Sequence, residues 1–331
     1  MARWRSVVTS LVVSSLVVSS IVVVALDARP GVAQSFPSKP IKMIVPFTPG
    51  SPVDVLARLV SQHAGTQLGQ TIVLENKPGA GTTIGTKLAA SADPDGYTLM
   101  IAATSFVISW AMYPKAGYDP LKSFDAIAFL ARSPQVLVIS PSVPATTVKE
   151  FVAYAHANPG KVNFGFGLGT LPQVLGEYFK VLTKTDIASI PYKGGEQVRV
   201  DMLGGRIQMN FGPPPSVLSL IRQGKVRALA VTAETRYPSL PEVPTFKESG
   251  LPQLSLSFTA GLVAPAGTPA SARRRLNEQI NETLRSPALI AAMAKLGYEP
   301  QPWTIAQYER FLADEVKTWP GILRQTGVKP P

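Results

Sequence analysis

Residues 41–74 read IKMIVPFTPGSPVDVLARLVSQHAGTQLGQTIVL, and this stretch predicts a strand, a helix and a second strand. The β-branched, apolar runs 41–45 and 71–74 are typical of short buried strands. Residues 52–68, between them, place apolar side chains at helical spacing. Ser51 is suited to be the N-cap of this helix, and Pro52 suits its first position because the missing N–H needs no partner there.

The alternation of strands and helices continues along the chain. Thr147 and Glu150 form a capping box that opens a helix ending near 158–160, and Gly224 is suited to end a later helix. From Pro269 onward the pattern is helical. The sequence therefore predicts an α/β fold with parallel-rich sheets covered by helices on both faces. The remaining elements are expected at 97–103, 136–140, 162–166, 176–182, 187–190, 198–203, 207–211, 216–223 and 226–232.

The first 35 residues have the order of a secretory signal. Arg3 and Arg5 precede an uncharged, apolar run over 6–26, and mostly small residues follow. Cleavage after Ala33 or after Ser35 would satisfy the small-x-small rule of such signals. The alternative is an uncleaved N-terminal anchor, because the apolar run is about long enough to span a bilayer. Both interpretations predict an exported chain.

Composition excludes several classes of site. The chain has no cysteine and two histidines, so a lipid-anchored cysteine, a thiolate nucleophile and a histidine-rich metal site are not expected. The net charge is +11, and loss of residues 1–35 removes three Arg and one Asp, which leaves +9. The basic residues are dispersed, and their densest cluster, 273–275, lies in one amphipathic helix. This favours a solvated basic surface that steers small anions over nucleic-acid binding, and we expect no cofactor.

Four loops rich in Gly, Ser, Thr and Pro follow predicted strands. They cover 46–54, 102–106, 166–172 and 191–195. Such loops present backbone N–H groups and hydroxyls at helix starts, where the helix dipole favours carboxylates and phosphates. One loop alone is typical of a tight turn. Because ligands of open α/β sheets bind beyond the carboxyl ends of strands, the four together indicate a shared anion-binding cleft.

No catalytic set emerges from the sequence. The run GFGLG at 165–169 lacks the full dinucleotide fingerprint, the G-x-S-x-G elbow is absent, and two dispersed histidines leave no Ser-His-acid set. Asp54 could act as a general base. More often an acid in the first helical turn complements the dipole and organises its own loop. We therefore expect a protein that is not an enzyme, with Asp54 mainly structural in a loop that also touches the ligand.

Short motifs follow one another in order along nearly the whole mature chain. They are FPSKPI (36–41), the loop 45–54, ENKPGAG (75–81), PDGYTL (94–99), YDP (118–120), PYKGG (191–195), GKVRALAVT (224–232), PEVPT (241–245) and APAGTP (264–269). Each motif alone is weak. In this order they resemble the tripartite tricarboxylate transporter receptors, also called Bug proteins, which are periplasmic solute-binding proteins.

The resemblance implies a two-lobed Venus-flytrap fold, type II-like, with two parallel-rich sheets and a hinge. Lobe 1 is expected to comprise 36–137 with 263–331, and lobe 2 to comprise 138–262. The resemblance also implies a periplasmic location and a small carboxylate held between the lobes. The closed form would dock on a membrane permease with a large and a small subunit, and a receptor that must hinge and dock is most simply a monomer.

The resemblance also implies which residues contact the ligand. In this family the ligand carboxylate is held by backbone N–H and hydroxyl groups of the strand-end loops, partly through water. Carried over to this sequence and combined with the four loops, the predicted ligand-binding residues are Phe47, Thr48, Gly50, Ser51, Asp54, Thr104, Ser105, Phe106, Gly169, Thr170, Gln173, Gly194 and Gly212.

Several positions depart from the family pattern toward small or apolar residues. The acid that would pair with a ligand amino group is missing at Gly212. We therefore expect a ligand with at least one carboxylate, an apolar or aromatic body and no basic amine. Phe47, Phe106 and Phe166 are candidate walls of the cleft, or else core residues. The departures are Ser51 for a second Gly, Val53 for Thr or Ser, Phe106 and Gln173 for His, and Gly212 for Asp.

Four classes of function remain to be compared. A receptor that delivers solute to a permease is the leading hypothesis. A ligand-sensing co-receptor of a signalling system is the alternative, and the sequence does not separate the two. A periplasmic enzyme would need a catalytic set, and a purely structural exported protein would have no use for the Gly/Ser/Thr loops.

Overall fold

The computed structural model describes residues 36–113, 115–192 and 194–329. The predicted signal peptide therefore lies outside the described residues. The chain divides into one unit over Met1–Ser38 and a second over Lys39–Pro331, and the fold below is that of the second. None of the helices in the described part of the chain is both long and apolar enough to cross a membrane.

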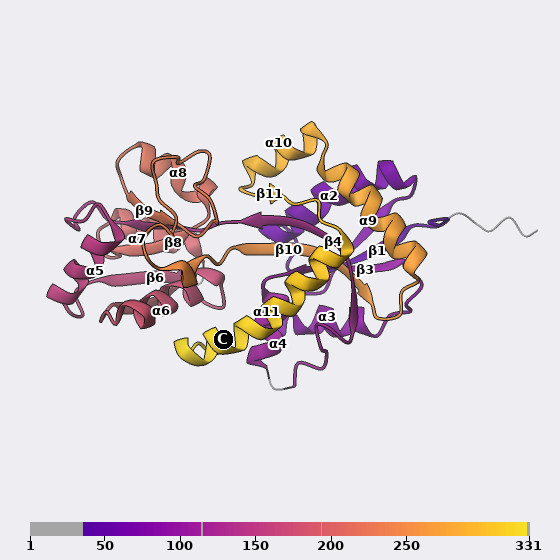
Figure 1. Cartoon of the computed structure of the whole chain (residues 1–331), viewed down its shortest axis with the longest axis horizontal. Coiled ribbons are helices and arrows are strands. Elements are labelled where there is room, and N and C mark those ends of the chain that lie inside the picture. Colours follow the sequence, from indigo (N-terminus) through magenta and orange to yellow (C-terminus); the bar gives the residue numbers. More distant parts are fainter. Residues whose placement is uncertain (1–35, 114, 193, 330–331) are drawn as a thin grey trace, which may run out of the picture. The chain divides into compact units, whose positions relative to one another are not determined.

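The first sheet has six strands in the order β11-β4-β10-β3-β1-β2 (Figure 1). β1 is parallel to β2 and β3, as predicted, whereas β10 is antiparallel to both β3 and β4. The sheet is therefore mixed, because the chain returns to it along β10 in the opposite direction. Its strands are β1 (Ile41–Val45), β2 (Ile72–Asn76), β3 (Thr98–Ala103), β4 (Phe124–Ser133), β10 (Phe258–Pro265) and β11 (Glu299–Pro300).

The second sheet has five strands in the order β7-β6-β8-β5-β9. β6 is parallel to β7 and β8, while β5 is antiparallel to β8 and β9, so this sheet is mixed as well. Its strands are β5 (Val136–Ile139), β6 (Asn163–Gly167), β7 (Ala188–Tyr192), β8 (Met209–Gly212) and β9 (Arg227–Val231).

Helices begin and end largely where local signals predict. α2 spans Pro52–Leu68 with Ser51 as its N-cap, and the capping box of Thr147 and Glu150 opens α5 (Val148–Ala157). Helix α4 (Ser105–Met112) was not predicted. The second Gly/Ser/Thr loop, 102–106, therefore leads directly into a helix that the sequence pattern did not indicate. The others are α3 (Thr83–Ala90), α6 (Leu171–Thr183), α7 (Gly195–Leu203), α8 (Pro214–Arg222), α9 (Ala270–Leu284), α10 (Pro287–Lys295) and α11 (Ile305–Thr326), with short 3-10 turns η1 (Ala80–Thr82) and η2 (Pro252–Leu254).

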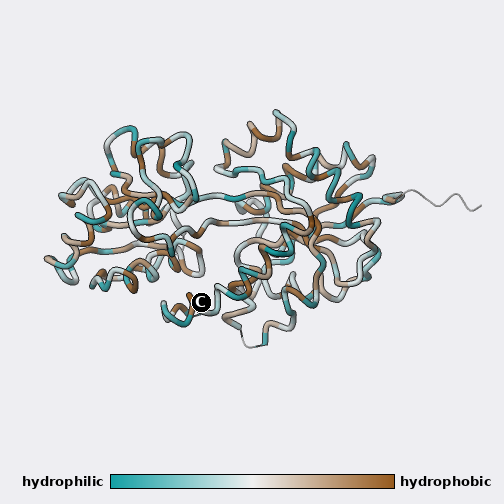
Figure 2. The backbone as a smooth tube through the Cα atoms, in the orientation of Figure 1, coloured by the Kyte–Doolittle hydropathy of each residue, from teal (hydrophilic) through white to brown (hydrophobic). Residues whose placement is uncertain are grey.

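Hydrophobic residues lie along the strands of both sheets, and their buried side chains form much of the hydrophobic core (Figure 2). α2 packs against α9, while α11 packs against β4 and α4 and continues onto α6 beside the second sheet. Trp319 near the end of α11 is fully buried and belongs to the same hydrophobic cluster as Phe179 of α6. Helix α11 therefore contacts the first sheet directly and reaches α6, a helix beside the second sheet.

The chain passes from the first sheet to the second at Pro134 and Gln135, between β4 and β5. The Gln135 backbone N–H donates to Thr232 Oγ1, and the Thr232 N–H donates to the Gln135 carbonyl, each at 2.9 Å. Thr232 follows β9 and begins the segment that returns to β10. These hydrogen bonds tie the outgoing and returning segments together, and we call this region the crossing.

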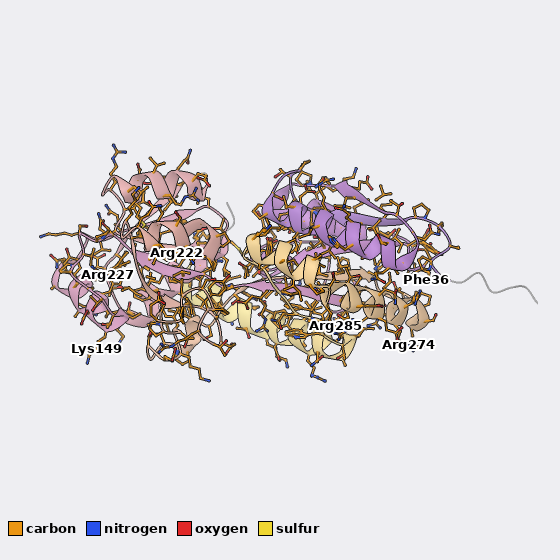
Figure 3. All side chains as sticks on the ribbon, turned by 90° about the horizontal axis from the view of Figure 1, so that it is seen from above. Phe36, Lys149, Arg222, Arg227, Arg274 and Arg285 are labelled. Atoms are coloured by element: carbon orange, nitrogen blue, oxygen red, sulfur yellow. The ribbon has the colours of Figure 1, made fainter. Side chains whose placement is uncertain are left out.

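Basic residues are spread over many elements, as the sequence predicts. Lys149, Arg222 and Arg274 extend from three different helices, Arg227 from a strand, and Arg285 from the residue that follows α9 (Figure 3). Within the 273–275 cluster, the guanidinium of half-buried Arg273 donates to the Ala126 carbonyl and pairs with Glu309 of α11. Part of the densest cluster therefore joins α9 to β4 and α11 and is not available to a polyanion.

Candidate site at the crossing

The strand register places the predicted loops at the crossing. In the first sheet, Arg132 at the end of β4 lies opposite Thr259 at the start of β10, and Ala260 lies opposite Ala103 at the end of β3. In the second sheet, Val136 at the start of β5 lies opposite Gly212 at the end of β8. Since β1 and β3 are parallel, as are β6, β7 and β8, the carboxyl ends of all these strands lie at the sheet edges that adjoin the crossing.

The carboxylate of Asp54 organises the loop between β1 and α2. Asp54 is 1% exposed and accepts from the Gly50 N–H (2.9 Å), Arg58 Nε (2.9 Å) and Nη2 (3.2 Å), and Asn76 Nδ2 (2.8 Å). Burial raises the pKa of Asp54, but the hydrogen bonds from Arg58, Asn76 and Gly50 together hold it below its usual value. Both carboxylate oxygens are occupied by protein donors, which agrees with the structural interpretation of this residue.

The rest of the first loop surrounds this buried acid. Ser51 Oγ accepts from the Asp54 N–H at 3.3 Å, which completes the predicted N-cap. Asn76 also donates to the carbonyl of half-buried Phe47 at 3.0 Å. Thr48 and Gly50 are exposed. The loop therefore keeps its acid inside and leaves Thr48 and Gly50 open to a ligand.

Replacing Asp54 should destabilise the protein more than a substitution in a surface loop usually does. We expect Asp54→Asn to lower the free energy of unfolding by about 2 to 4 kcal/mol at pH 7, because an amide sets N–H against three neighbouring donors and removes the charge paired with Arg58. The pKa of Asp54 is lower in the folded protein than in the unfolded chain. Its carboxylate therefore stabilises the fold fully above the unfolded pKa and loses this effect as the pH falls through the folded pKa. The difference in stability between wild type and Asp54→Asn should accordingly become smaller in acid. Urea unfolding measures both, and Asp93→Asn, at an exposed position, is the control. A loss below about 0.5 kcal/mol, the usual range for surface changes, would contradict the assigned role.

The second loop is fastened to β10. Thr104 N–H donates to the Thr259 carbonyl at 3.0 Å, and Thr259 N–H donates to Thr104 Oγ1 at 2.8 Å. Half-buried Ser105 follows as the first residue of α4, and its hydroxyl oxygen is buried without a hydrogen-bond partner among the described residues. Phe106 lies in the core, stacked on Tyr118 with ring centroids 5.5 Å apart. The polar members of this loop thus lie beside the crossing, whereas the aromatic one supports it from within.

The third and fourth loops lie side by side at the edge of the second sheet. Gly169 has a φ of +69° and donates its N–H to Gln173 Oε1 at 2.8 Å, and Thr170 Oγ1 donates to the Gly167 carbonyl at 2.7 Å. A Cβ on Gly167 would lie 3.7 Å from the Cα of Gly194. The structure therefore brings Gly169, Thr170, Gln173 and Gly194 together.

Gly212, at the end of β8, is buried between side chains. A Cβ there would lie 2.8 Å from Val217 and 3.2 Å from Ser216 Oγ, so an acid could not replace the glycine without movement of its neighbours. Phe166, on neighbouring β6, is buried and stacks on Phe164 at 5.1 Å. Of the three candidate aromatic walls, only Phe47 is partly exposed.

Three polar residues that the sequence does not single out lie at the crossing or shortly before β10. Arg132 Nε, Gln135 Oε1 and Ser255 Oγ are buried and, like Ser105 Oγ, have no hydrogen-bond partner in the part of the chain that the structure describes. Buried polar groups without partners are rare and cost free energy. Arg132 could have been noticed as a lone cation near the end of the apolar run FDAIAFLARS at 124–133.

A small cavity lies behind the second loop, between the first sheet and α11. Its polar lining comes from Thr104, Thr259 and Glu315, and the rest is mostly apolar and aromatic. Burial raises the pKa of Glu315 to about 7, although Trp319 Nε1 donates to its carboxylate at 2.7 Å. An ionisable group therefore lies close behind the strand ends of the first sheet.

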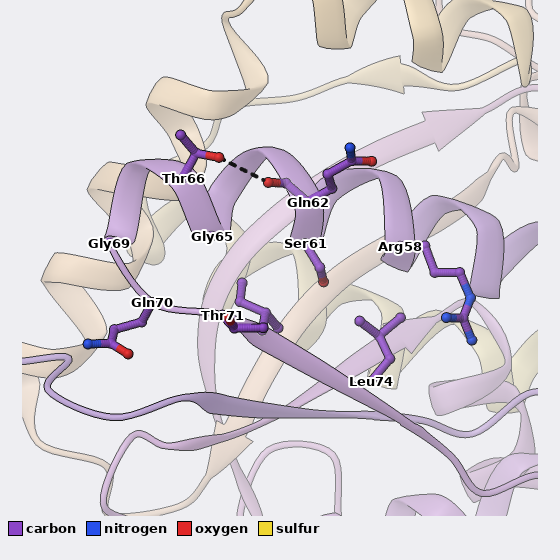
Figure 4. A pocket seen from close by; sticks show the side chains of 10 residues that line it. Arg58, Ser61, Gln62, Gly65, Thr66, Gly69, Gln70, Thr71 and Leu74 are labelled. Carbon is purple, nitrogen blue, oxygen red and sulfur yellow. Dashed lines mark hydrogen bonds between the residues drawn. The ribbon is translucent and has the colours of Figure 1, made fainter.

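Two wider grooves lie away from the predicted site residues. One runs between α2 and the start of β2 and is lined by Ser61, Thr66 and Gln70 among others (Figure 4). The second lies between α8 and α10 and is flanked by Arg222 and Lys295. None of the residues predicted to contact the ligand lines either groove, and across 36–113, 115–192 and 194–329 no His, Asp or Glu residues gather as a metal site would require.

Comparison with known proteins identifies the family. Residues 56–328 match the family described as the tripartite tricarboxylate transporter family receptor. The chain belongs to this family. The receptor is 37% identical over 305 residues to protein BugT of Bordetella pertussis, which covers 91% of this chain and 94% of that protein. Members of the family are periplasmic solute-binding receptors and not enzymes.

Solved structures resemble the receptor over most of its length. The periplasmic binding protein BugD is 31% identical, with a TM-score of 0.72 over 89% of this chain and 99% of that one. Two proteins of Rhodopseudomonas palustris, Rpa4515 with adipate and MatC with bound malate, are 30% and 28% identical, with TM-scores of 0.74 and 0.71. They cover 89% and 87% of this chain and each is covered completely. The two-sheet architecture is thus that of a two-lobed periplasmic binding protein, as predicted.

Proposed function

We propose that the receptor binds a small carboxylate at the crossing and delivers it to a membrane permease with a large and a small subunit. The observation that carries the proposal is that strand ends of both sheets adjoin the crossing, where polar atoms are buried without a hydrogen-bond partner among the described residues. A bound carboxylate and its ordered water molecules would give these atoms hydrogen-bond partners. The cost of burying them without partners would then be removed, which favours ligand binding.

The contacts are divided between the two sheets. From the first sheet, Thr48 and Ser51 of the β1–α2 loop and Ser105 at the start of α4 would offer hydroxyl groups, beside Gly50, whose N–H already donates to Asp54. From the second, Gly194 and the backbone around Gly169 and Thr170 would face the ligand, although the Gly169 N–H and the Thr170 hydroxyl already donate to protein acceptors. Asp54, Phe106 and Gly212 then shape the site from behind. This division follows the proposed lobes, 36–137 with 263–331 and 138–262, apart from the ends of β5 and β10 at the crossing, so that closure about the crossing would complete the site.

The body of the ligand is proposed to be apolar and to carry no amino group. An acidic side chain at position 212 would clash with Val217 and Ser216. Among the predicted contacts the one carboxylate is that of Asp54, and both of its oxygens already accept hydrogen bonds. Adipate, bound by the related Rpa4515, has this chemistry, whereas an amino acid does not. We further propose that residues 1–35 are cleaved on export and that the mature receptor is a periplasmic monomer.

A thermal-shift screen of the mature receptor tests the proposal. A ligand that binds only the folded state stabilises it by about 2.7 kcal/mol at a hundredfold excess over Kd. We expect a shift with one or more aliphatic or aromatic carboxylates and none with the matched primary amides. Ser105→Ala should reduce the shift without lowering the Tm of the free protein, because its hydroxyl has no partner among the described residues. Ser271→Ala, at an exposed position of α9, should change neither. Shifts that are as large with amides as with acids would contradict carboxylate binding.

A further inference from the structure

Arg132 is held in an aromatic frame at the end of β4. Its guanidinium lies 5.0 Å from the ring centre of Trp303, 5.5 Å from that of Phe311 and 5.9 Å from that of Phe129. Phe129 and Trp303 also stack on each other at 4.1 Å. Such cation–π contacts fix the orientation of a guanidinium and leave its N–H groups free to donate.

The charge of Arg132 is not used by a protein carboxylate. No carboxylate of the described residues forms an ion pair with it within 4.0 Å, and its buried Nε has no acceptor. Glu299 and Glu315 are near enough to sense its charge, but burial prevails at both, and the pKa of each carboxyl is raised. Burial therefore weakens the competition of both glutamates for the guanidinium, whose Nε has no acceptor among the described residues.

Arg132 lies two strands away from the loop that is proposed to hold the ligand carboxylate. Arg132 lies opposite Thr259 across β4 and β10, and Thr259 is hydrogen-bonded to Thr104, next to the unpartnered hydroxyl of Ser105. From β4 across β10 to this loop is two strand spacings, or about 10 Å. A short dicarboxylate could therefore reach both places at once.

We propose that Arg132 is the residue that selects a ligand with a second carboxylate: its guanidinium binds the distal carboxylate while the strand-end loops hold the first. This inference rests on the proposed function, since it assigns one end of the same ligand. A guanidinium donates two parallel hydrogen bonds to a carboxylate, which makes the contact sensitive to both the charge and the planar shape of the group.

Calorimetric titration with paired ligands tests the role of Arg132. The probes are the straight-chain dicarboxylates from succinate to suberate and the monocarboxylates of the same carbon number, from butyrate to octanoate. We expect the wild-type receptor to prefer the dicarboxylate of the best pair. Arg132→Gln should weaken that dicarboxylate about 10- to 100-fold and leave the monocarboxylate within about twofold, and Arg132→Lys should restore only part of the preference.

The controls separate selection from a structural role. Arg222→Gln, an exposed cation on α8, should leave both affinities unchanged, and retained monocarboxylate binding shows that the Arg132 variants are folded. If Arg132→Gln weakens both members of the pair equally, or neither, the inference is overturned and the receptor function stands. A wild-type preference for monocarboxylates overturns it too. Failure of the wild-type receptor to bind any carboxylate overturns the proposed function together with the inference.

Discussion

Replacing Glu315 by Gln should remove a large part of the pH dependence of stability. In the folded protein burial raises the pKa of Glu315 to about 7, above its ordinary value of 4.5. Between these two values the folded state keeps a proton that the unfolded state releases, so wild-type stability falls as the pH rises and levels off above the folded pKa. From pH 5 to pH 8 we expect the wild type to lose about 2 to 3 kcal/mol relative to Glu315→Gln.

The substitution leaves the packing around Glu315 nearly unchanged. Glutamine has the same shape and still offers an oxygen to Trp319 Nε1, which donates at 2.7 Å. The groups that act on Glu315 are Trp319 and Asp314 on its own helix and Arg132 on β4, and all remain. Urea unfolding of both proteins at pH 5 and pH 8 measures the effect, because every other titrating group cancels in the comparison.

A control at an exposed carboxylate distinguishes burial from charge. Glu278→Gln on α9 removes the same charge from an exposed position and should shift stability by less than about 0.5 kcal/mol at both pH values. Equal stability differences between wild type and Glu315→Gln at pH 5 and pH 8 would show that Glu315 ionises in the folded protein as it does in water.

Local signals in the sequence were enough to predict much of the fold. Ser51 and Pro52 mark the start of α2, and Thr147 with Glu150 marks the start of α5, because caps act on backbone groups within one turn. The direction of β10 could not be predicted in this way. Its partners β3 and β4 lie more than 100 residues earlier in the chain, and strand direction depends on how the chain returns.

The candidate site shows the same limit. Asp54 could be interpreted from its place in the first turn of a helix, and its hydrogen bonds to Gly50, Arg58 and Asn76 bear out the structural role. Arg132 and Gln135 carry no such local signal. Their polar atoms matter because they are buried without partners beside the crossing, and that property arises only when segments far apart in the sequence meet.

Gly176→Ala should destabilise the second sheet strongly, although it adds a single methyl group. Gly176 lies in α6, directly over Phe164 of β6, and a Cβ on it would lie 2.0 Å from two ring carbons of that side chain. The ring has little room to move, since Phe164 is fully buried and packs against Phe166 at 5.1 Å and Phe211 at 6.4 Å. We expect a loss of about 2 to 4 kcal/mol in the free energy of unfolding, measured in urea, because overpacking outweighs the better helix propensity of alanine.

A second glycine and a compensating change separate overpacking from helix propensity. Gly321→Ala, in α11, has no atom within 4 Å of the new Cβ and should stabilise by about 0.5 to 1 kcal/mol. Phe164→Leu shortens the side chain beneath Gly176, so Gly176→Ala should cost at least 1 kcal/mol less, as a rough estimate, when made in that variant. If the cost of Gly176→Ala is the same in both backgrounds, α6 can move away from β6, and its close approach to Phe164 does not hold the helix in place.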